Sequence, residues 1–384
     1  MKKKTALFIG LTYIAIICAA NNPTSLASTP DSWAQKASIP YPHGIYQFAA
    51  ASFNGHNYVA TPPNDLWVYD TGADTWTKQG QIPLPTGLSL SSTYGLSVCE
   101  NKLYVMGAVT NSTMFLTYVN QAYDFATNTW QNKTAIEFGY DCKADIVNGK
   151  IYMLYDNAVY DPANDSWSQI AANPAAPTDG RHVFEEYASA VLDGKIYVMG
   201  GFWRTGWSDY TFLDSVEIYD PATNLWTQGA PMPKAMSGMA AGTTGTYAAE
   251  RIYVMGGIDA NFTVYNSTQV YDPQSGNWST ATPMPISTND LNLVNVNDQL
   301  YALGRTANYQ YTPANWTEPA PTPTPTSTPS PTQTPTLSPA PTLTPSASVP
   351  EFPAWTALLL ILVIISVAVA VTAKRDRLRK PSFS

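Results

Sequence analysis

Short apolar runs recur along this chain at a regular interval and alternate with polar turns. The clearest are Ile196–Gly201 and Ile252–Gly257, which both read Ile-Tyr-Val-Met-Gly-Gly and directly follow charged residues. Runs of this length and composition predict strands. A repeated unit of roughly 45–55 residues built from such strands is typical of a radial β-propeller, in which each unit forms one blade.

A tyrosine near the end of a strand is followed seven positions later by a tryptophan in six places. These pairs are Tyr69 and Trp76, Tyr123 and Trp130, Tyr160 and Trp167, Tyr219 and Trp226, Tyr271 and Trp278, and Tyr309 and Trp316. Aromatic residues that recur once per unit fit the gaps between wedge-shaped blades. We therefore interpret these side chains as structural.

Residues 187–233 show the predicted unit most clearly. Its four strands are expected at residues 187–191, 196–201, 216–219 and 225–227. Asp193-Gly194 predicts the turn between the first two strands, because both positions of that turn need positive φ. Pro231 and Pro233 end the fourth strand, since proline has no N–H to donate to a ladder.

The double glycines Gly200-Gly201 and Gly256-Gly257, the Tyr-Asp-Pro sequences and the spaced tryptophans resemble kelch repeats. The resemblance extends over about residues 31–317, although it is carried by the fourth and fifth units. It implies an all-β fold, a six-bladed kelch-type β-propeller in which residues 32–38 complete the blade that contains Leu300-Tyr301. Trp316 competes for that place, so the alternative is a seventh, incomplete blade.

The two ends of the chain have the composition of export and anchoring segments. Residues 1–27 begin with three lysines and continue with an apolar run, which predicts a signal peptide cleaved after Ala20 or Ala27. Residues 354–373 carry no charge and match the thickness of a bilayer, and a basic cluster at 374–380 follows. This order predicts a single-pass membrane helix with a cytoplasmic C-terminus and an extracellular propeller.

Between the propeller and the anchor, residues 318–350 consist almost wholly of Pro, Thr, Ser and Ala, which predicts an extended, disordered stalk. The predicted domains are therefore 1–27, 28–317, 318–350 and 351–384. Pro350-Glu-Phe-Pro353, the apolar span and the basic cluster resemble the tripartite C-terminal sorting signals of archaeal surface proteins. That resemblance implies either a retained helix or its replacement by a lipid.

The predicted exterior part of the chain is strongly acidic. Between residues 31 and 318 there are 26 Asp and Glu against 12 Lys and Arg. Such a surface repels phosphate backbones, which argues against a nucleic-acid partner. Cys99 and Cys142 fall at different levels of neighbouring units, so we interpret them as buried thiols rather than a disulfide.

The most unusual loop is Phe202–Tyr210, between the second and third strands of the fourth unit. Its aromatic and guanidinium side chains suit a sugar or a peptide carboxylate, unless they fold down onto their own blade. Loops that enter the fourth and first blades bring further polar side chains to the same face. The candidate binding residues are Trp203, Arg204, Trp207, Tyr210, Arg181, His182 and His43.

Seven Asn-x-Ser/Thr triplets lie outside the predicted membrane span, and in an exported chain they predict a glycoprotein. They are Asn111, Asn132, Asn164, Asn261, Asn266, Asn277 and Asn315. Three of them, at 111, 261 and 266, belong to loops between second and third strands. Glycans there would crowd two sectors of the candidate binding face.

The sequence favours a non-catalytic, membrane-anchored ectodomain that binds an extracellular protein or glycan. A structural envelope component, or a carbohydrate-active oxidase or sialidase-like enzyme, is the alternative. Kelch-like propellers include a copper oxidase, whose site needs two His and two Tyr. The histidines of the chain are His43, His56 and His182, and the sequence shows no spacing of Cys and His typical of a metal site. We expect no cofactor and no metal.

Overall fold

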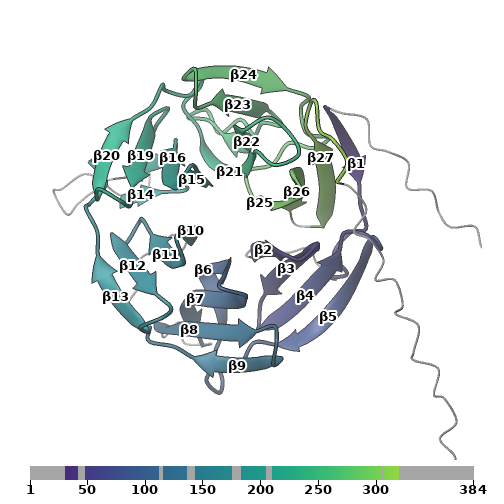
Figure 1. Cartoon of the computed structure of the whole chain (residues 1–384), viewed down its shortest axis with the longest axis vertical. Coiled ribbons are helices and arrows are strands. Elements are labelled where there is room, and N and C mark those ends of the chain that lie inside the picture. Colours follow the sequence, from purple (N-terminus) through teal and green to yellow (C-terminus); the bar gives the residue numbers. More distant parts are fainter. Residues whose placement is uncertain are drawn as a thin grey trace, which may run out of the picture. The chain divides into compact units, whose positions relative to one another are not determined.

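The structure is a computed structural model that describes residues 31–41, 48–111, 116–135, 143–174, 183–204, 210–304 and 306–319. The predicted signal peptide, the stalk beyond residue 319 and the anchor lie outside this part. No helix within the described ranges has the length and apolar character needed to cross a bilayer. Figure 1 shows that the strands of the described part form a ring of blades.

The described strands form six four-stranded antiparallel sheets and one three-stranded sheet. Each four-stranded sheet is one blade, with its first strand innermost (Figure 1). Blade 1 contains β2 (Ala49–Phe53), β3 (His56–Thr61), β4 (Asp65–Asp70) and β5 (Thr75–Gln81). Blade 2 contains β6 (Ser89–Cys99), β7 (Lys102–Thr110), β8 (Leu116–Asp124) and β9 (Thr129–Asn132). Blade 3 contains β10 (Asp145–Val147), β11 (Lys150–Met153), β12 (Ala158–Asp161) and β13 (Ser166–Gln169).

The second half of the ring repeats this arrangement. Blade 4 contains β15 (Ala188–Leu192), β16 (Lys195–Met199), β19 (Val216–Asp220) and β20 (Leu225–Gln228). Blade 5 contains β21 (Ser237–Thr244), β22 (Arg251–Ile258), β23 (Thr268–Asp272) and β24 (Asn277–Ala281). Blade 6 contains β25 (Asn292–Val296), β26 (Gln299–Gly304), β27 (Ala307–Thr312) and β1 (Ser32–Gln35). The three-stranded sheet joins β14 (Val183–Glu185), β17 (Phe202–Arg204) and β18 (Tyr210–Phe212).

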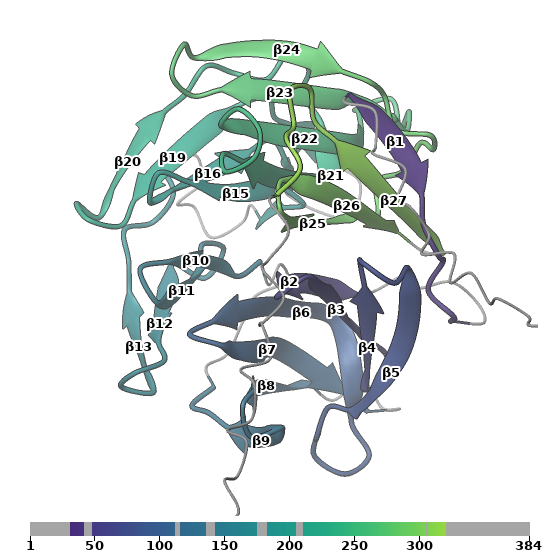
Figure 2. The same cartoon turned by 45° about the vertical axis from the view of Figure 1, so that its right-hand side comes forward.

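The N-terminal strand closes the ring, as the sequence predicted. β1 pairs with β27 along its whole length and supplies the outer strand of blade 6, and the two strands lie side by side in Figures 1 and 2. Trp33 lies opposite Tyr311, with ring centroids 5.0 Å apart. The alternative, in which Trp316 would take this place, is wrong. Trp316 follows the end of β27, and its indole N–H donates to the carbonyl of Asn297.

The tyrosine and tryptophan of each blade face one another on adjacent strands. The five remaining pairs have ring centroids 5.0–5.1 Å apart. In five blades the indole N–H also donates to a backbone carbonyl of the preceding blade's exit, namely Ala37, Thr134, Ala171, Ala230 and Thr282. The repeated aromatics therefore join blades as well as filling the space between them.

A second repeated contact uses the residue five positions after the tyrosine, which lies in the turn before the outer strand. In blade 4, Asn224 Oδ1 accepts the hydroxyl of Tyr219 at 2.7 Å and the N–H of Ala171 at 2.8 Å. We call this pair of bonds the Asx bridge, because one side-chain oxygen joins a blade to its predecessor. Asp74 in blade 1 and Asp165 in blade 3 make the same two bonds, and so does Asp31, which directly precedes β1, the outer strand of blade 6.

The two double glycines allow a close approach between chain segments. Gly200 and Gly256 have φ of 63° and 72°, and a Cβ there would lie 2.6 and 2.5 Å from the carbonyl oxygens of Met236 and Thr288. Any other residue would be strained and would clash. The linkers that leave blades 4 and 5 therefore cross directly over the ends of β16 and β22.

Cys99 is a buried free thiol in the described part, which agrees with its predicted state. Burial raises its pKa to about 11, so the thiol stays protonated and unreactive at neutral pH. Cys142 lies outside the described residues.

Candidate functional site

The loops between second and third strands all emerge on one face, because successive strands of an antiparallel blade alternate in direction. We call this the 2–3 face and the opposite one the 1–2 face. On the 2–3 face, blades 1 and 3 have short connections at 62–64 and 154–157. Blades 4 and 5 have the long connections 200–215 and 259–267.

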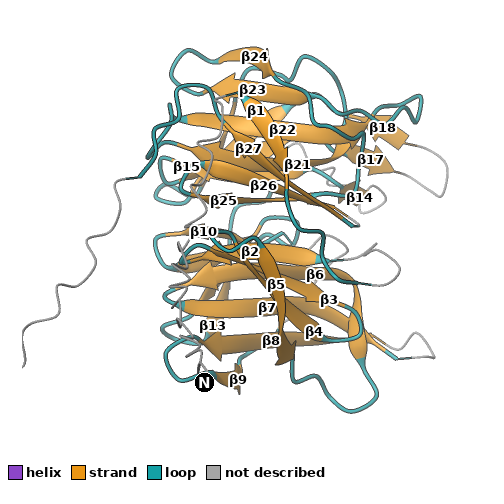
Figure 3. Ribbon diagram, turned by 90° about the vertical axis from the view of Figure 1, so that its right-hand side faces the viewer, coloured by secondary structure: helices purple, strands orange, loops and turns teal. Residues whose placement is uncertain are grey.

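The long connection of blade 4 contains a β-hairpin in place of the irregular loop that the sequence suggested. β17 pairs with β18, and β14 from the incoming linker pairs with β17. Figure 3 shows this small sheet at one side of the ring seen edge-on. Paired strands fix side-chain directions more firmly than an open loop does.

A triangle of backbone hydrogen bonds holds the base of this connection. The N–H of Gly201 donates to Met236, that of Met236 to Leu213, and that of Leu213 to Gly201, at 2.8–3.1 Å. Blade 5 makes the same triangle with Gly257, Thr288 and Tyr265. Both long connections are thus tied to the linker that leaves their own blade.

Exposed apolar side chains gather between these two connections. We call Tyr210, Phe212, Phe262 and Val264 the aromatic patch. Phe262 is 65% exposed, Tyr210 38% and Val264 37%, whereas Phe212 is half-buried. The ring of Phe262 stands edge-on to those of Tyr210 and Phe212, with centroids 6.3 and 6.4 Å apart. The patch therefore joins side chains of two blades into one surface.

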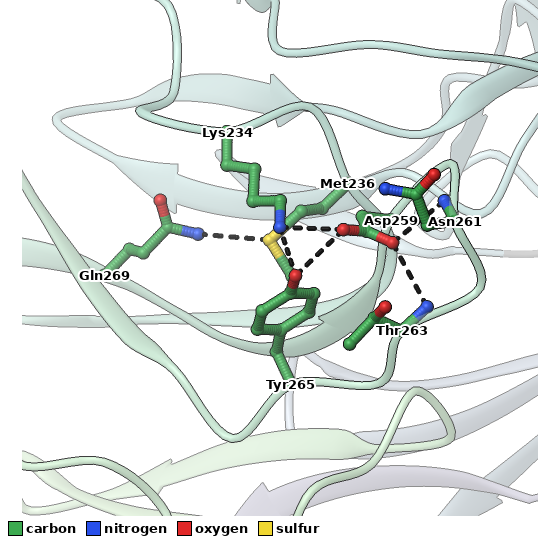
Figure 4. Close-up of polar contacts among 7 residues, drawn as sticks. All are labelled: Lys234, Met236, Asp259, Asn261, Thr263, Tyr265 and Gln269. Atoms are coloured by element: carbon green, nitrogen blue, oxygen red, sulfur yellow. Dashed lines mark hydrogen bonds and ion pairs between the residues drawn. The ribbon is translucent and has the colours of Figure 1, made fainter.

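A buried carboxylate fixes the shape of the blade 5 connection (Figure 4). Asp259 Oδ1 accepts the N–H groups of Asn261 and Thr263, and Oδ2 accepts the hydroxyl of Tyr265 at 2.8 Å. The ammonium of Lys234 lies 2.7 Å from Asp259 Oδ2 and 3.9 Å from the centroid of the Tyr265 ring. The hydrogen bond from Lys234 holds the pKa of Asp259 well below its usual range, and Asp259 raises the pKa of Lys234. The pair stays charged at every physiological pH.

This network holds Phe262 in an unfavourable backbone conformation. Phe262 has φ of 57°, in the left-handed region that costs a residue with a side chain about 1–2 kcal/mol. Its N–H donates to the carbonyl of Asp259 at 2.8 Å. A large apolar side chain held exposed by a strained backbone suggests a role in binding.

The kelch motif model matches residues 186–233 and 239–285, which are blades 4 and 5. These are the two units that carried the resemblance in the sequence, and the remaining blades share their strand order. The chain is a kelch-repeat β-propeller protein.

Curated relatives match parts of the kelch propeller. Kelch-like protein 35 of Mus musculus is 31% identical over 137 residues, which cover 35% of this chain and 22% of the relative. Kelch-like protein 25 of Xenopus tropicalis is 28% identical over 281 residues, covering 66% of this chain and 43% of the relative. The chain thus spans less than half the length of either protein.

The solved structure of YjhT is similar in fold to this kelch propeller. It superposes with a TM-score of 0.55 over 72% of this chain and 94% of its own, at 16% sequence identity. At that identity the likeness supports the propeller architecture alone.

The β17–β18 hairpin separates Trp203, Arg204 and Tyr210, which the sequence analysis had grouped into one binding loop. Alternation along β17 directs Trp203 to one face of the hairpin, where it packs against the core between blades 3 and 4. Arg204 points to the other face and donates to Glu185 at 2.6 Å. Its guanidinium is already bound within the molecule. Tyr210 belongs to the aromatic patch.

Four other candidates, Trp207, Arg181, His182 and His43, lie outside the described residues. Phe212, Phe262 and Val264 were not among the predicted site residues. Phe262 and Val264 alternate with polar residues in the predicted connection Asp259–Ser267, and this was the signal that could have indicated those two.

The predicted glycosylation sites occupy several parts of the propeller. Asn111, Asn261 and Asn266 lie in or beside connections on the 2–3 face. Asn261 is exposed and directly precedes Phe262, whereas the amide of Asn266 donates to the carbonyl of Met284 at 2.9 Å. The other four lie on outer strands, in a turn between strands, or after β27; they are Asn132, Asn164, Asn277 and Asn315.

A cavity of about 270 Å³ lies at the propeller axis and is lined by the inner strands of all six blades. Among the described residues that line it, the cation is Lys143, which donates to the carbonyl of Tyr187 and lies 5.1 Å from the centroid of the Tyr187 ring. No group of three or more His, Cys, Asp or Glu suited to a metal ion occurs within the described ranges.

Proposed function

We propose that this kelch propeller is displayed outside the cell, tethered by its C-terminal segment, and binds another protein through the aromatic patch. Kelch propellers generally bind proteins. The observation that carries the proposal is the patch itself, an exposed apolar surface on two connections that are tied down by hydrogen bonds. Exposed apolar surface on a rigid frame is typical of a docking site.

A protein fits this surface better than a glycan does. Sugars are held by stacking together with several directed hydrogen bonds, and Arg204 was the planar donor expected to supply them. Arg204 is occupied by Glu185, and Lys234 by Asp259 and Tyr265. The patch offers mainly apolar area, which suits an apolar anchor from a protein partner.

The exit of the chain supports the proposed tether. After β27, the indole N–H of Trp316 donates to the carbonyl of Asn297, and the backbone N–H of Thr317 donates to the carbonyl of Tyr247 at 2.9 Å. Both acceptors lie in connections between first and second strands, so residues 313–317 cross the 1–2 face. The eight residues of β22 span roughly 25 Å between the two faces. A tether on the 1–2 face would leave the patch facing away from it.

Photocrosslinking in the cell of origin tests this function. Benzoylphenylalanine replaces Phe262 in the full chain, and a matched chain carries it at Leu225, an apolar residue 62% exposed at the start of β20. We expect a defined protein adduct from position 262 that position 225 does not give. Equal adducts from the two positions, or none from 262, would contradict docking at the patch.

Two further measurements test the other parts of the proposal. A glycan array probed with wild type and Phe262→Ala distinguishes the two ligand classes. A glycan that binds wild type and not the variant would show that the ligand of the patch is a glycan and not a protein. External protease added to intact cells should degrade the propeller. A propeller that stays intact until the cells are lysed would contradict display outside.

A further inference from the structure

The charges around the aromatic patch are unevenly distributed. The described residues of the elements that bound it carry four carboxylates, on Glu185, Glu186, Asp214 and Asp259, and two cations, on Arg204 and Lys234. Each cation is already bound to a carboxylate, Arg204 to Glu185 at 2.6 Å and Lys234 to Asp259 at 2.7 Å. The field that a partner meets at the patch is therefore negative.

The rest of the propeller strengthens this field. Its 26 acidic and 12 basic residues give the region from 31 to 318 a large negative charge. Glu186 and Asp214 are exposed on the elements beside the patch. An acidic partner would be repelled over a Debye length of about 8 Å at physiological salt, whereas a basic partner would be attracted.

The molecule itself shows how an ammonium is held at the edge of the patch. Lys234 lies over the ring of Tyr265, at 3.9 Å from the centroid, with the carboxylate of Asp259 beside it. This arrangement combines a cation–π contact with an ion pair. Phe262 offers a second aromatic ring that is largely exposed, on the same connection.

We propose that the partner segment recognised by the aromatic patch is basic, with a Lys or Arg side chain seated over Phe262 and an apolar residue beside it. This inference rests on the proposed function and names the chemistry of the partner. The aliphatic stem of Lys or Arg covers apolar surface while its charged group reaches for a carboxylate. Asp214 is the one we name, because it follows by two residues Phe212, whose ring lies 6.4 Å from that of Phe262. One side chain thereby satisfies both the aromatic and the acidic character of the site.

Selection from a library of random dodecapeptides displayed on phage tests the inference, with the purified full chain as the target. Enriched peptides are synthesised, and their affinity is measured by fluorescence anisotropy for wild type, Phe262→Ala, Asp214→Lys and Leu225→Ala. Thermal unfolding of each variant confirms that it is folded. We expect Lys or Arg beside apolar residues in the enriched peptides, and weaker binding at higher salt.

The variants should differ in a defined order. Phe262→Ala should weaken binding at least tenfold, Asp214→Lys several-fold, and Leu225→Ala not at all. Acidic or neutral peptides that lose affinity in Phe262→Ala would overturn the basic partner and leave the docking surface intact. Peptides that bind Phe262→Ala as tightly as wild type, or the enrichment of no peptide, would count against docking at the patch itself.

Discussion

Blade 5 lacks the Asx bridge that joins its neighbours, and restoring it should stabilise the propeller. The equivalent position is Gly276, which has φ of 69° and no side chain. The local geometry is otherwise the same as in blade 4. The N–H of Gly276 donates to Asp272 at 2.8 Å, just as that of Asn224 donates to Asp220 at 2.8 Å.

Gly276→Asn should therefore place an amide oxygen near two donors. One is the hydroxyl of Tyr271, which precedes position 276 by five residues. The other is the N–H of Ala230, because Trp278 donates to the carbonyl of Ala230 as Trp226 does to that of Ala171. A Cβ at position 276 meets no atom within 4 Å, so the substitution causes no clash.

The expected gain follows from three terms. Two hydrogen bonds contribute about 1 kcal/mol each, and replacing a glycine lowers the entropy of the unfolded chain by a further ~0.5 kcal/mol. The left-handed conformation costs about 1 kcal/mol, since asparagine tolerates it better than most residues. The free energy of unfolding should rise by about 1–2 kcal/mol, which corresponds to roughly 2–4 °C in Tm for a domain of this size.

Calorimetry and urea unfolding of the variant measure this gain. Gly276→Ala is the matched control, because it carries the same backbone strain without an acceptor, and it should be destabilised by about 1 kcal/mol. Asn224→Gly removes the bridge of blade 4 and should lose about 2 kcal/mol. If Gly276→Asn were no more stable than Gly276→Ala, the bridge would not be an energetic link between blades.

Three other predictions concern single positions. In calorimetry Gly256→Ala should unfold several degrees below wild type, because its Cβ would lie 2.5 Å from a carbonyl oxygen; Gly194→Ala, with φ of 69° and open space, should lose only about 1 kcal/mol. Glu217 is 2% exposed, and burial raises the pKa of its carboxyl group. The free energy of unfolding should therefore fall as the pH rises above about 4.3, the pKa of Glu in the unfolded chain. In measurements of Tm against pH, Glu217→Gln should remove this loss at pH 7 and change little at pH 3. Glycopeptide mass spectrometry after secretion from a glycosylating host should find Asn261 occupied and Asn266 free, because the Asn266 amide is hydrogen-bonded to the backbone; the reverse pattern would contradict this account.

The repeat made the frame of the molecule predictable from the sequence. Turns such as Asp193-Gly194 and the regular order of strands predicted where each blade lies. Trp33 indicated the closing strand, because it has the sequence context of an outer-strand tryptophan but no blade of its own. The choice between Trp33 and Trp316 was not visible in the spacing. It depends on which strand pairs with β27, a contact between residues almost 280 positions apart.

The candidate site was harder to predict, because it depends on which residues face one another. Trp203 and Arg204 are neighbours in sequence but lie on opposite faces of a hairpin that the sequence showed only as a loop. Arg204 finds its partner, Glu185, in β14, a strand of the segment that enters blade 4. Phe262 joins Tyr210 across two blades, and no local pattern reports such a contact.

The two blades that follow the kelch pattern most closely are also those that carry the candidate site, and the backbone gives a reason. A long connection at the end of β16 or β22 needs a rigid base if its side chains are to hold a fixed position. The second glycine of each pair supplies that base, because its N–H and C=O bond the outgoing linker and the returning connection at once. At Gly257, with φ of 100°, a Cβ would lie 2.5 Å from the side chain of Met239, so no other residue fits without displacement. The double glycine of blades 4 and 5 is therefore what allows the long connections of these two blades to present a defined surface.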